Sequence, residues 1–444
     1  MKLFIPDPSL VVLIGVMGAG KSAFARRHFA PDEIVTADPD ADPDADPDAA
    51  PDAAPTSDED DVTAAPDAFD DVLYAAIAQR LLTGRLTVVD AANVRAARRQ
   101  PLVALARRSH LFPIAVVLDT PEEVCRERNS ARLERAVDPG VLRRQYVELR
   151  SGLRHLRREG FRDVYILSSP DDAAAAVVER RPLPVNRTGD HGPFDVIGDL
   201  HGCRDELAGL LRLLGYRVTS DTTGRSLWGG PIYGHLEGRK AVFLGDLVDR
   251  GPHILDTVRL VRNMAATGAA LCVPGNHDTK LLRALRGHDV QVRHGLETTL
   301  AELDRLPRPA RARFAGEVAD FLAALPSHYV LDDGRLAAAH AGLPEELQGR
   351  DAGRVWSFAL YGQPTGEVDA SGLPVRYNWA ADYHGRAAVV YGHTPIPAPE
   401  WLNNTINIDT GCVYGGRLTA LRYPERQVVS VPAARAYYQR AKKG

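Results

Sequence analysis

The stretch FDVIGDLHG, residues 194–202, is the first of five segments built in the same way. In each segment a short apolar run, with the length of a buried strand, leads into a polar residue that can ligate a metal. The other four are KAVFLGDLVDRGP (240–252), ALCVPGNHD (270–278), LAAAHAGL (336–343) and AVVYGHTP (388–395). This repetition predicts buried strands whose ends together hold a metal centre.

The candidate ligands of this centre are a mixed set of carboxylates, one amide and imidazoles. In the Asp-x-His turn, Asp199 and His201 can address one ion, and Asp246 is well placed to bridge two. The second ion would be completed by Asn276, His340 and His393. A set of this kind suits two divalent ions and predicts cleavage of phosphoesters.

Four further residues of these segments are candidates for catalysis. Arg250, in DRGP, can clamp a phosphate with two parallel hydrogen bonds, and His277 can protonate a leaving alkoxide. Asp249 and Asp278 are expected to orient those groups. A lone His or Asp commonly satisfies a turn, so the prediction rests on the ordered set.

A second motif lies in the N-terminal half, where GVMGAGKS (15–22) follows an apolar run and opens a helical pattern. Glycines let backbone amides close around phosphate oxygens, and the helix N-terminus favours their negative charge. Lys21 would reach the β- and γ-phosphates, and the Ser22 hydroxyl would take Mg²⁺. The residues expected to bind ATP or another NTP are Gly15, Gly18, Ala19, Gly20, Lys21, Ser22 and Asp90.

Other residues could complete a phosphotransfer site. Asp38 could act as general base for an acceptor hydroxyl, and Asp90 could hold a water of Mg²⁺; the alternative for each is a turn or N-cap residue. Arg128 and Arg132 lie four apart in EVCRERNSARLER and would share one helix face. That pair suits a lid that clamps the transferred phosphate, and the alternative is a solvated helix face.

The chain of 444 residues is long enough for two domains. We place an α/β domain with a parallel sheet at 1–181, a linker at 182–193 and the metal-ligand segments at 194–444. Expected strands of the first domain are residues 10–14, 86–89, 113–118 and 164–167. An amphipathic helix is expected to contain Phe69, Val72, Leu73, Ala76, Ile77 and Leu81 and to stop near Gly84.

Residues 39–68 form an acidic insert in which proline recurs at every fourth position from Pro39 to Pro55. Such a segment can bury almost nothing, so we expect it to be disordered. Residues 38–71 hold 14 of the 58 acidic residues and no Lys or Arg, which leaves 54 basic against 44 acidic residues elsewhere. That balance suits a polyanionic partner such as nucleic acid.

Two further features limit the class of protein to which the chain can belong. The chain shows no membrane span and no signal sequence, so we expect a cytoplasmic protein. Its four cysteines have no paired spacing, which indicates neither a zinc site nor a disulfide framework.

GDLHG, GDLVDRGP, GNHD, HAG, GHTP and NIDTGCVYGG resemble the calcineurin-like binuclear metallophosphoesterases, whose fold has two sheets flanked by helices. Together with GVMGAGKS, LTVVDAANV and LDTPEEVCRERNSAR, the chain resembles the bacterial polynucleotide kinase-phosphatases of RNA repair. The resemblance implies a P-loop kinase that phosphorylates 5′-OH ends. It also implies a phosphatase that removes 2′-phosphate, 3′-phosphate and 2′,3′-cyclic phosphate with two ions, Mn²⁺ or alternatively Ni²⁺ or Fe.

The same resemblance implies RNA ends, or DNA ends, as substrates, and a separate RNA ligase and RNA-end methyltransferase as partners. It leaves the oligomeric state open, with a homodimer as one arrangement. Two features depart from the family, because Pro39 and the acidic insert follow Asp38 and no Lys-x-Asp-Gly ligase motif is present. The alternatives are a signalling serine/threonine phosphatase or dinucleoside-tetraphosphate hydrolase fused to a small-molecule kinase, and a nucleic-acid-binding module with a degenerate kinase half.

Overall fold

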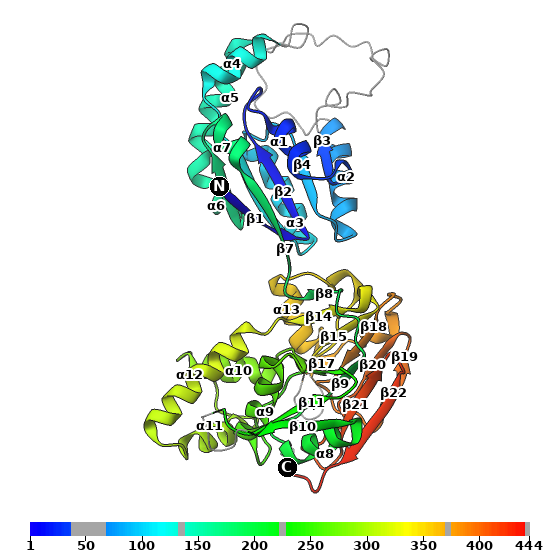
Figure 1. Cartoon of the computed structure of the whole chain (residues 1–444). Coiled ribbons are helices and arrows are strands. Elements are labelled where there is room, and N and C mark those ends of the chain that lie inside the picture. The colour runs from blue at the N-terminus through cyan, green and yellow to red at the C-terminus, as the bar shows by residue number, and fades with distance from the viewer. Residues whose placement is uncertain (37–67, 132–137, 222–227, 369–373, 440–444) are drawn as a thin grey trace. The chain divides into compact units, whose positions relative to one another are not determined.

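The computed structural model describes residues 1–36, 68–131, 138–221, 228–368 and 374–439. The chain divides into two compact units, Met1–Leu183 and Pro184–Gly444 (Figure 1). Among the described residues, no helix combines the length and the apolar character that crossing a membrane requires.

The first unit is built on a five-stranded sheet in which all neighbouring strands are parallel. Its spatial order is β3 (Ile34–Thr36), β4 (Thr87–Asp90), β2 (Ser9–Ile14), β5 (Phe112–Leu118) and β6 (Asp163–Leu167). The central strand β2 is buried at all six positions, as expected for a strand covered on both faces. The four strands predicted for this domain are therefore confirmed.

Helices and one small ribbon complete this unit. The helix predicted around residues 69–81 is α2 (Ala68–Leu82), and Gly84 follows it with a positive φ of 69°. The ribbon pairs β1 (Lys2–Asp7) in parallel with β7 (Val177–Pro182). The other helices are α1 (Lys21–His28), α3 (Ala96–Arg108), α4 (Glu122–Ser130), α5 (Pro139–Gly152), α6 (Leu156–Glu159) and α7 (Pro170–Ala175).

The second unit contains two larger sheets. One has the order β13 (Ala270–Cys272), β12 (Lys240–Phe243), β9 (Phe194–Ile197), β21 (Arg417–Tyr423) and β22 (Gln427–Pro432). The other has the order β19 (Trp401–Leu402), β20 (Thr405–Asn407), β18 (Ala388–Tyr391), β15 (Leu336–Ala339), β14 (His328–Leu331) and β8 (Asn186–Arg187). Short pairs are β10 (Tyr216–Asp221) with β11 (Pro231–His235) and β16 (Pro364–Val368) with β17 (Pro374–Arg376).

Side-chain alternation along the strands shows how the layers of this unit pack. In β12, Val242 packs in a core shared by strands of both sheets, whereas its neighbours Ala241 and Phe243 pack in a core with helices. In β15, Ala338 faces the shared core and Ala339 faces a third core that includes α13 (Gly353–Tyr361). The two sheets therefore lie face to face between helices, as the predicted fold class requires. The helices beside the first sheet include α8 (Arg204–Leu214), α9 (Ile254–Ala266), α10 (Asn276–Leu285), α11 (Leu296–Asp304) and α12 (Arg308–Ala324).

The expected linker at 182–193 differs from what the structure shows. Asn186 and Arg187 form β8, which pairs in parallel with β14 at the edge of a sheet of the second unit. Leu183 and Val185 are buried, and the Val185 carbonyl accepts a hydrogen bond from the Val330 amide at 2.8 Å. The polar and proline-containing composition of the segment predicts an exposed linker, and two isolated apolar residues did not indicate burial.

Candidate active sites

The GVMGAGKS segment forms the loop between β2 and α1, and α1 begins at Lys21. Gly18 and Gly20 have positive φ values of 79° and 97°, which glycine adopts without strain. A Cβ on Gly18 would come within 2.7 Å of the Cys125 carbonyl oxygen, so helix α4 also requires a glycine there. The Lys21 ammonium folds back over the loop and donates to the carbonyls of Gly15 and Val16, at 3.0 Å each.

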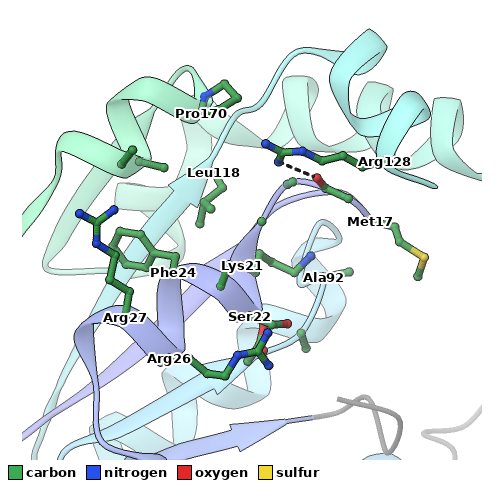
Figure 2. A pocket seen from close by; sticks show the side chains of 18 of the residues that line it. Met17, Lys21, Ser22, Phe24, Arg26, Arg27, Ala92, Leu118, Arg128 and Pro170 are labelled. Carbon is green, nitrogen blue, oxygen red and sulfur yellow. Dashed lines mark hydrogen bonds between the residues drawn. The ribbon is translucent and has the colours of Figure 1, made fainter. Parts of the chain in front are cut away.

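This loop borders a cavity of about 730 Å³, which Figure 2 shows from close by. Arg128 reaches across the loop from α4, and its Nη1 donates to the Gly18 carbonyl at 3.2 Å (Figure 2). The lining of this cavity includes Asp90 at the end of β4, Ser22 and Lys21. The structure thus brings together the residues expected to bind nucleotide and one of the two predicted lid arginines.

Two of the residues predicted for this site, Asp38 and Arg132, lie outside the described residues. Conversely, Arg26, Arg27 and Arg98 line the cavity although the sequence analysis did not select them. Arginine is frequent throughout the chain, so nothing in the local pattern distinguished these three. They make the cavity strongly cationic, which favours a polyanionic ligand.

The second site gathers the strand ends of both sheets of the second unit. Asp199 and His201 follow β9, Asp246 follows β12, and Asn276 follows β13 at the start of α10. From the other sheet, His340 follows β15 and His393 follows β18.

All six predicted ligands meet at this site. Asp199, Asp246 and His340 offer ligand atoms within 4.8 Å of one another, and so do His201, Asp246 and His277. Asp246 belongs to both groups, which fits the expectation that it bridges two ions. The His340 Nε2 atom lies 3.0 Å from Asn276 Oδ1 and 3.1 Å from His393 Nδ1.

Glycines bring the chain close enough for this arrangement. A Cβ on Gly392 would lie 2.2 Å from Asp199 Oδ1, and a Cβ on Gly275 would lie 2.0 Å from Asp246 Oδ1. Several non-glycine residues of the site also have the left-handed backbone conformation, which costs roughly 1–3 kcal/mol at each of them. These residues are His201, Asp246, Asp249, Arg250 and His393, with φ between 41° and 74°.

Hydrogen bonds orient two of the imidazoles for metal binding. The Nδ1 of His201 lies 2.8 Å from the Val248 carbonyl, and the Nδ1 of His340 lies 2.9 Å from the Leu244 carbonyl. Because a carbonyl only accepts, each Nδ1 carries the proton and each Nε2 is left with its lone pair toward the site.

The electrostatics of the site favour added cations. Burial lowers the pKa of His201, and burial with the neighbouring His340 lowers that of His393 to about 3, so these imidazoles are neutral. Burial, with the charges of Asp409 and Asp246, raises the pKa of Asp199 well above its usual range. Burial alone would also raise the pKa of Asp246, but electrostatic attraction to the surrounding His340, His277, His201 and Arg250 side chains holds it well below that range. Buried carboxylates that repel one another beside neutral imidazoles fit divalent ions.

The predicted catalytic residues surround this centre. His277 Nδ1 lies 2.7 Å from Asp249 Oδ2, and both side chains are buried. The Arg250 guanidinium lies 2.6 Å from His201 Nε2 and 2.8 Å from His277 Nε2. The Asp278 carboxylate accepts from the amides of Leu247 and Gly275, at 2.9 and 2.8 Å, so it holds the two ligand-bearing loops together.

One residue of the site, Asp409, was missed. It follows β20, is buried, and lies close enough to Asp199 to raise the pKa of that carboxyl. Its Oδ1 accepts from the Gly411 amide at 3.0 Å. The sequence signal for Asp409 lies in NIDTG, where a short strand pattern again ends in a carboxylate.

Comparisons with known proteins agree with this geometry. An AAA domain matches residues 10–153, and a calcineurin-like phosphoesterase domain matches residues 192–415, slightly over half of the chain. The bis(5′-nucleosyl)-tetraphosphatase PrpE (asymmetrical) of Anoxybacillus flavithermus is 46% identical over 244 residues, which cover 55% of this chain and 96% of that protein. The PrpE protein of Bacillus subtilis is 45% identical with the same coverage.

Among solved structures, a putative diadenosine tetraphosphatase matches with 27% identity and a TM-score of 0.40, over 56% of this chain and 97% of that one. The calcineurin-like match lies within the second unit and includes the metal-ligand segments, and the AAA match includes the GVMGAGKS loop. The chain is therefore an enzyme with a kinase-like P-loop domain and belongs to the calcineurin-like phosphoesterases.

Proposed function

We propose that this enzyme heals nucleic-acid ends, with RNA ends as the principal substrate and DNA ends as the alternative. The P-loop unit would transfer the γ-phosphate of ATP, or of another NTP, to a 5′-OH end. The phosphoesterase unit would remove a 2′-phosphate, a 3′-phosphate or a 2′,3′-cyclic phosphate. The observation that carries this proposal is that one chain contains both a cavity bordered by the GVMGAGKS loop and a cluster of metal-ligating residues with a buried His–Asp pair.

In the first unit the chain's own groups would position and neutralise the triphosphate. The loop amides and Lys21 would surround the β- and γ-phosphates, and Arg128, which bonds to the loop at Gly18, would stabilise the charge that develops during transfer. Ser22 and Asp90 would hold Mg²⁺, which would supply positive charge to the transferred phosphate. Asp38 is proposed to accept the proton of the attacking hydroxyl.

In the second unit Arg250 would clamp the phosphate, because its guanidinium lies within the site, against the Nε2 atoms of His201 and His277, and would exchange these contacts for phosphate oxygens. Two divalent ions, proposed as Mn²⁺, would be held by the six ligands and Asp409 and would supply Lewis-acid charge to the phosphoryl oxygens. With Arg250 engaged by the phosphate instead of by His277 Nε2, His277 would carry a proton on Nε2 and give it to the departing sugar oxygen, while Asp249 stabilises the charged imidazole from the Nδ1 side.

A second candidate is asymmetrical hydrolysis of a dinucleoside tetraphosphate, which the names of the PrpE relatives favour. The leaving group of that reaction is a nucleotide phosphate that departs without a proton. A sugar alkoxide needs a proton donor, so the buried Asp249–His277 pair supports the end-healing candidate. An end-healing product carries a 5′-phosphate and a 3′-OH, which would be passed to a separate RNA ligase.

The test compares substrates on the purified wild-type chain. An oligonucleotide with a 5′-OH and a 3′-phosphate is incubated with ATP, Mg²⁺ and Mn²⁺, and kcat/KM at each end is compared with that for a dinucleoside tetraphosphate. The proposal predicts that both ends change and that the oligonucleotide is preferred. Hydrolysis of the tetraphosphate with neither end changed would refute it and support the second candidate.

A further inference from the structure

A cavity of about 890 Å³ in the second unit is not explained by the metal centre. Its walls include Tyr414, Tyr438, Pro395 and Ile396. No charged side chain of the described residues lines it. The two tyrosine rings lie 6.4 Å apart between centroids, with an angle of 63° between their planes. The cavity therefore offers flat, uncharged surfaces to a ligand.

This cavity adjoins the proposed phosphate site. The Arg250 guanidinium carbon lies 5.5 Å from the centroid of the Tyr414 ring and 5.8 Å from that of Tyr438. Pro395 is two residues beyond His393, and the cavity residue Thr410 directly follows Asp409. A phosphate held by Arg250 would thus place the rest of its nucleotide at the mouth of the cavity.

The C-terminal segment that supplies Tyr438 is fixed by backbone and side-chain contacts. The amides of Tyr437 and Tyr438 donate to the Val413 carbonyl at 2.9 and 3.0 Å. The Tyr437 hydroxyl donates to Glu206 Oε1 at 2.7 Å. The backbone bonds do not depend on the Tyr438 side chain, so that ring can be replaced without removing them.

We infer that this cavity binds the nucleobase of the nucleotide that carries the scissile phosphate, an inference that rests on the proposed end-healing function. A base stacks on an aromatic ring whatever its identity, because every base has a π-face. A cavity lined by tyrosines and prolines without charges therefore accepts any terminal base. Arg250, in contact with both rings, couples base binding to the position of the phosphate.

The experiment uses two oligonucleotides that end in a 3′-phosphate and differ only at the terminal nucleotide. One has an ordinary base, and the other has a tetrahydrofuran residue without a base. The measured quantity is the preference, the ratio of kcat/KM for the two substrates, in the full-length enzyme. Tyr438→Ala should reduce the preference by about 5- to 150-fold, the range expected for loss of one base–aromatic stack.

Two variants serve as matched controls. Tyr438→Phe keeps the ring and should keep the preference, and Tyr437→Phe alters the neighbouring tyrosine, which contacts Glu206, and should also keep it. If Tyr438→Ala fails to fold, Tyr438→Trp provides the second test, because a larger stacking face should retain or increase the preference.

An unchanged preference in Tyr438→Ala, or a loss of preference in Tyr438→Trp, would overturn the inference. A wild-type enzyme that processes both oligonucleotides equally would overturn it too, while leaving the proposed function intact. Release of phosphate from neither oligonucleotide would refute the proposed function, and the base subsite with it.

Discussion

The buried pair of His277 and Asp249 makes the most specific chemical prediction of the structure. Asp249 is fully buried, its Oδ2 lies 2.7 Å from His277 Nδ1, and its other oxygen accepts from Thr299. Asp249→Asn removes the charge that stabilises a protonated imidazole. Asparagine tolerates the backbone φ of 72° at this position, so the loop should keep its shape. Because a positioned general acid contributes about 100- to 10,000-fold, kcat should fall within that range for a sugar leaving group.

The assay compares two substrates with each variant. Removal of a 3′-phosphate requires protonation of an alkoxide, whereas p-nitrophenyl phosphate releases a stable phenolate that needs no proton. Asp249→Asn and His277→Ala should both slow the first reaction far more than the second. The double variant should be no slower than His277→Ala alone, because Asp249 acts through the imidazole. Equal losses on both substrates would refute a general-acid role.

Three further outcomes are expected. Chelation of divalent ions with EDTA should lower the melting temperature, because a ligand at 100 times its Kd stabilises the folded state by about 2.7 kcal/mol. Added Mn²⁺ should restore the melting temperature of the wild type but not that of Asp246→Asn. Burial lowers the pKa of His328 to about 3, and its Nε2 accepts from the Gly349 amide. Below about pH 6.5 the unfolded chain therefore binds a proton at this imidazole that the folded chain does not bind. Chemical denaturation should show that the free energy of unfolding falls by about 2 kcal/mol from neutral pH to pH 5, and that this fall is smaller in His328→Gln. Replacement of residues 40–64 by a short Gly-Ser bridge should lower the kinase KM for an oligonucleotide at low salt and not at high salt, because the acidic insert would compete with nucleic acid for the kinase unit. A KM that is unchanged at every ionic strength would show that the insert is only a spacer.

Much of the fold and of both sites could be predicted because the local pattern carries the information. An apolar run followed by a ligand marks a strand end, and parallel strands place such ends at one edge of a sheet. Asp199 and Asp246 could therefore be selected together, and His340 follows the same local pattern at a strand end of the other sheet, 141 positions beyond Asp199. The glycines and Lys21 of the phosphate loop could be predicted because the motif that contains them has a fixed spacing along the chain.

The remainder depends on contacts between residues whose sequence context is ordinary. Tyr414 and Tyr438 share a cavity only because the C-terminal segment bonds back to Val413. The thiols of Cys203 and Cys412 lie together beside Glu206, although the spacing of the cysteines showed no pairing. Such neighbours arise from the tertiary fold, so periodicity along the chain does not reveal them.

In the proposed enzyme, one chain carries two independent active sites that act on the two ends of one substrate class. The most direct measurement incubates a 5′-OH, 3′-phosphate oligonucleotide, labelled so that both ends are read, with ATP and divalent ions. Lys21→Ala should leave the 5′ end unmodified and still release the 3′-phosphate, and His340→Ala should do the reverse, because the two residues lie in separate units. Loss of both activities in either folded variant, or no change at either end with the wild type, would contradict the claim.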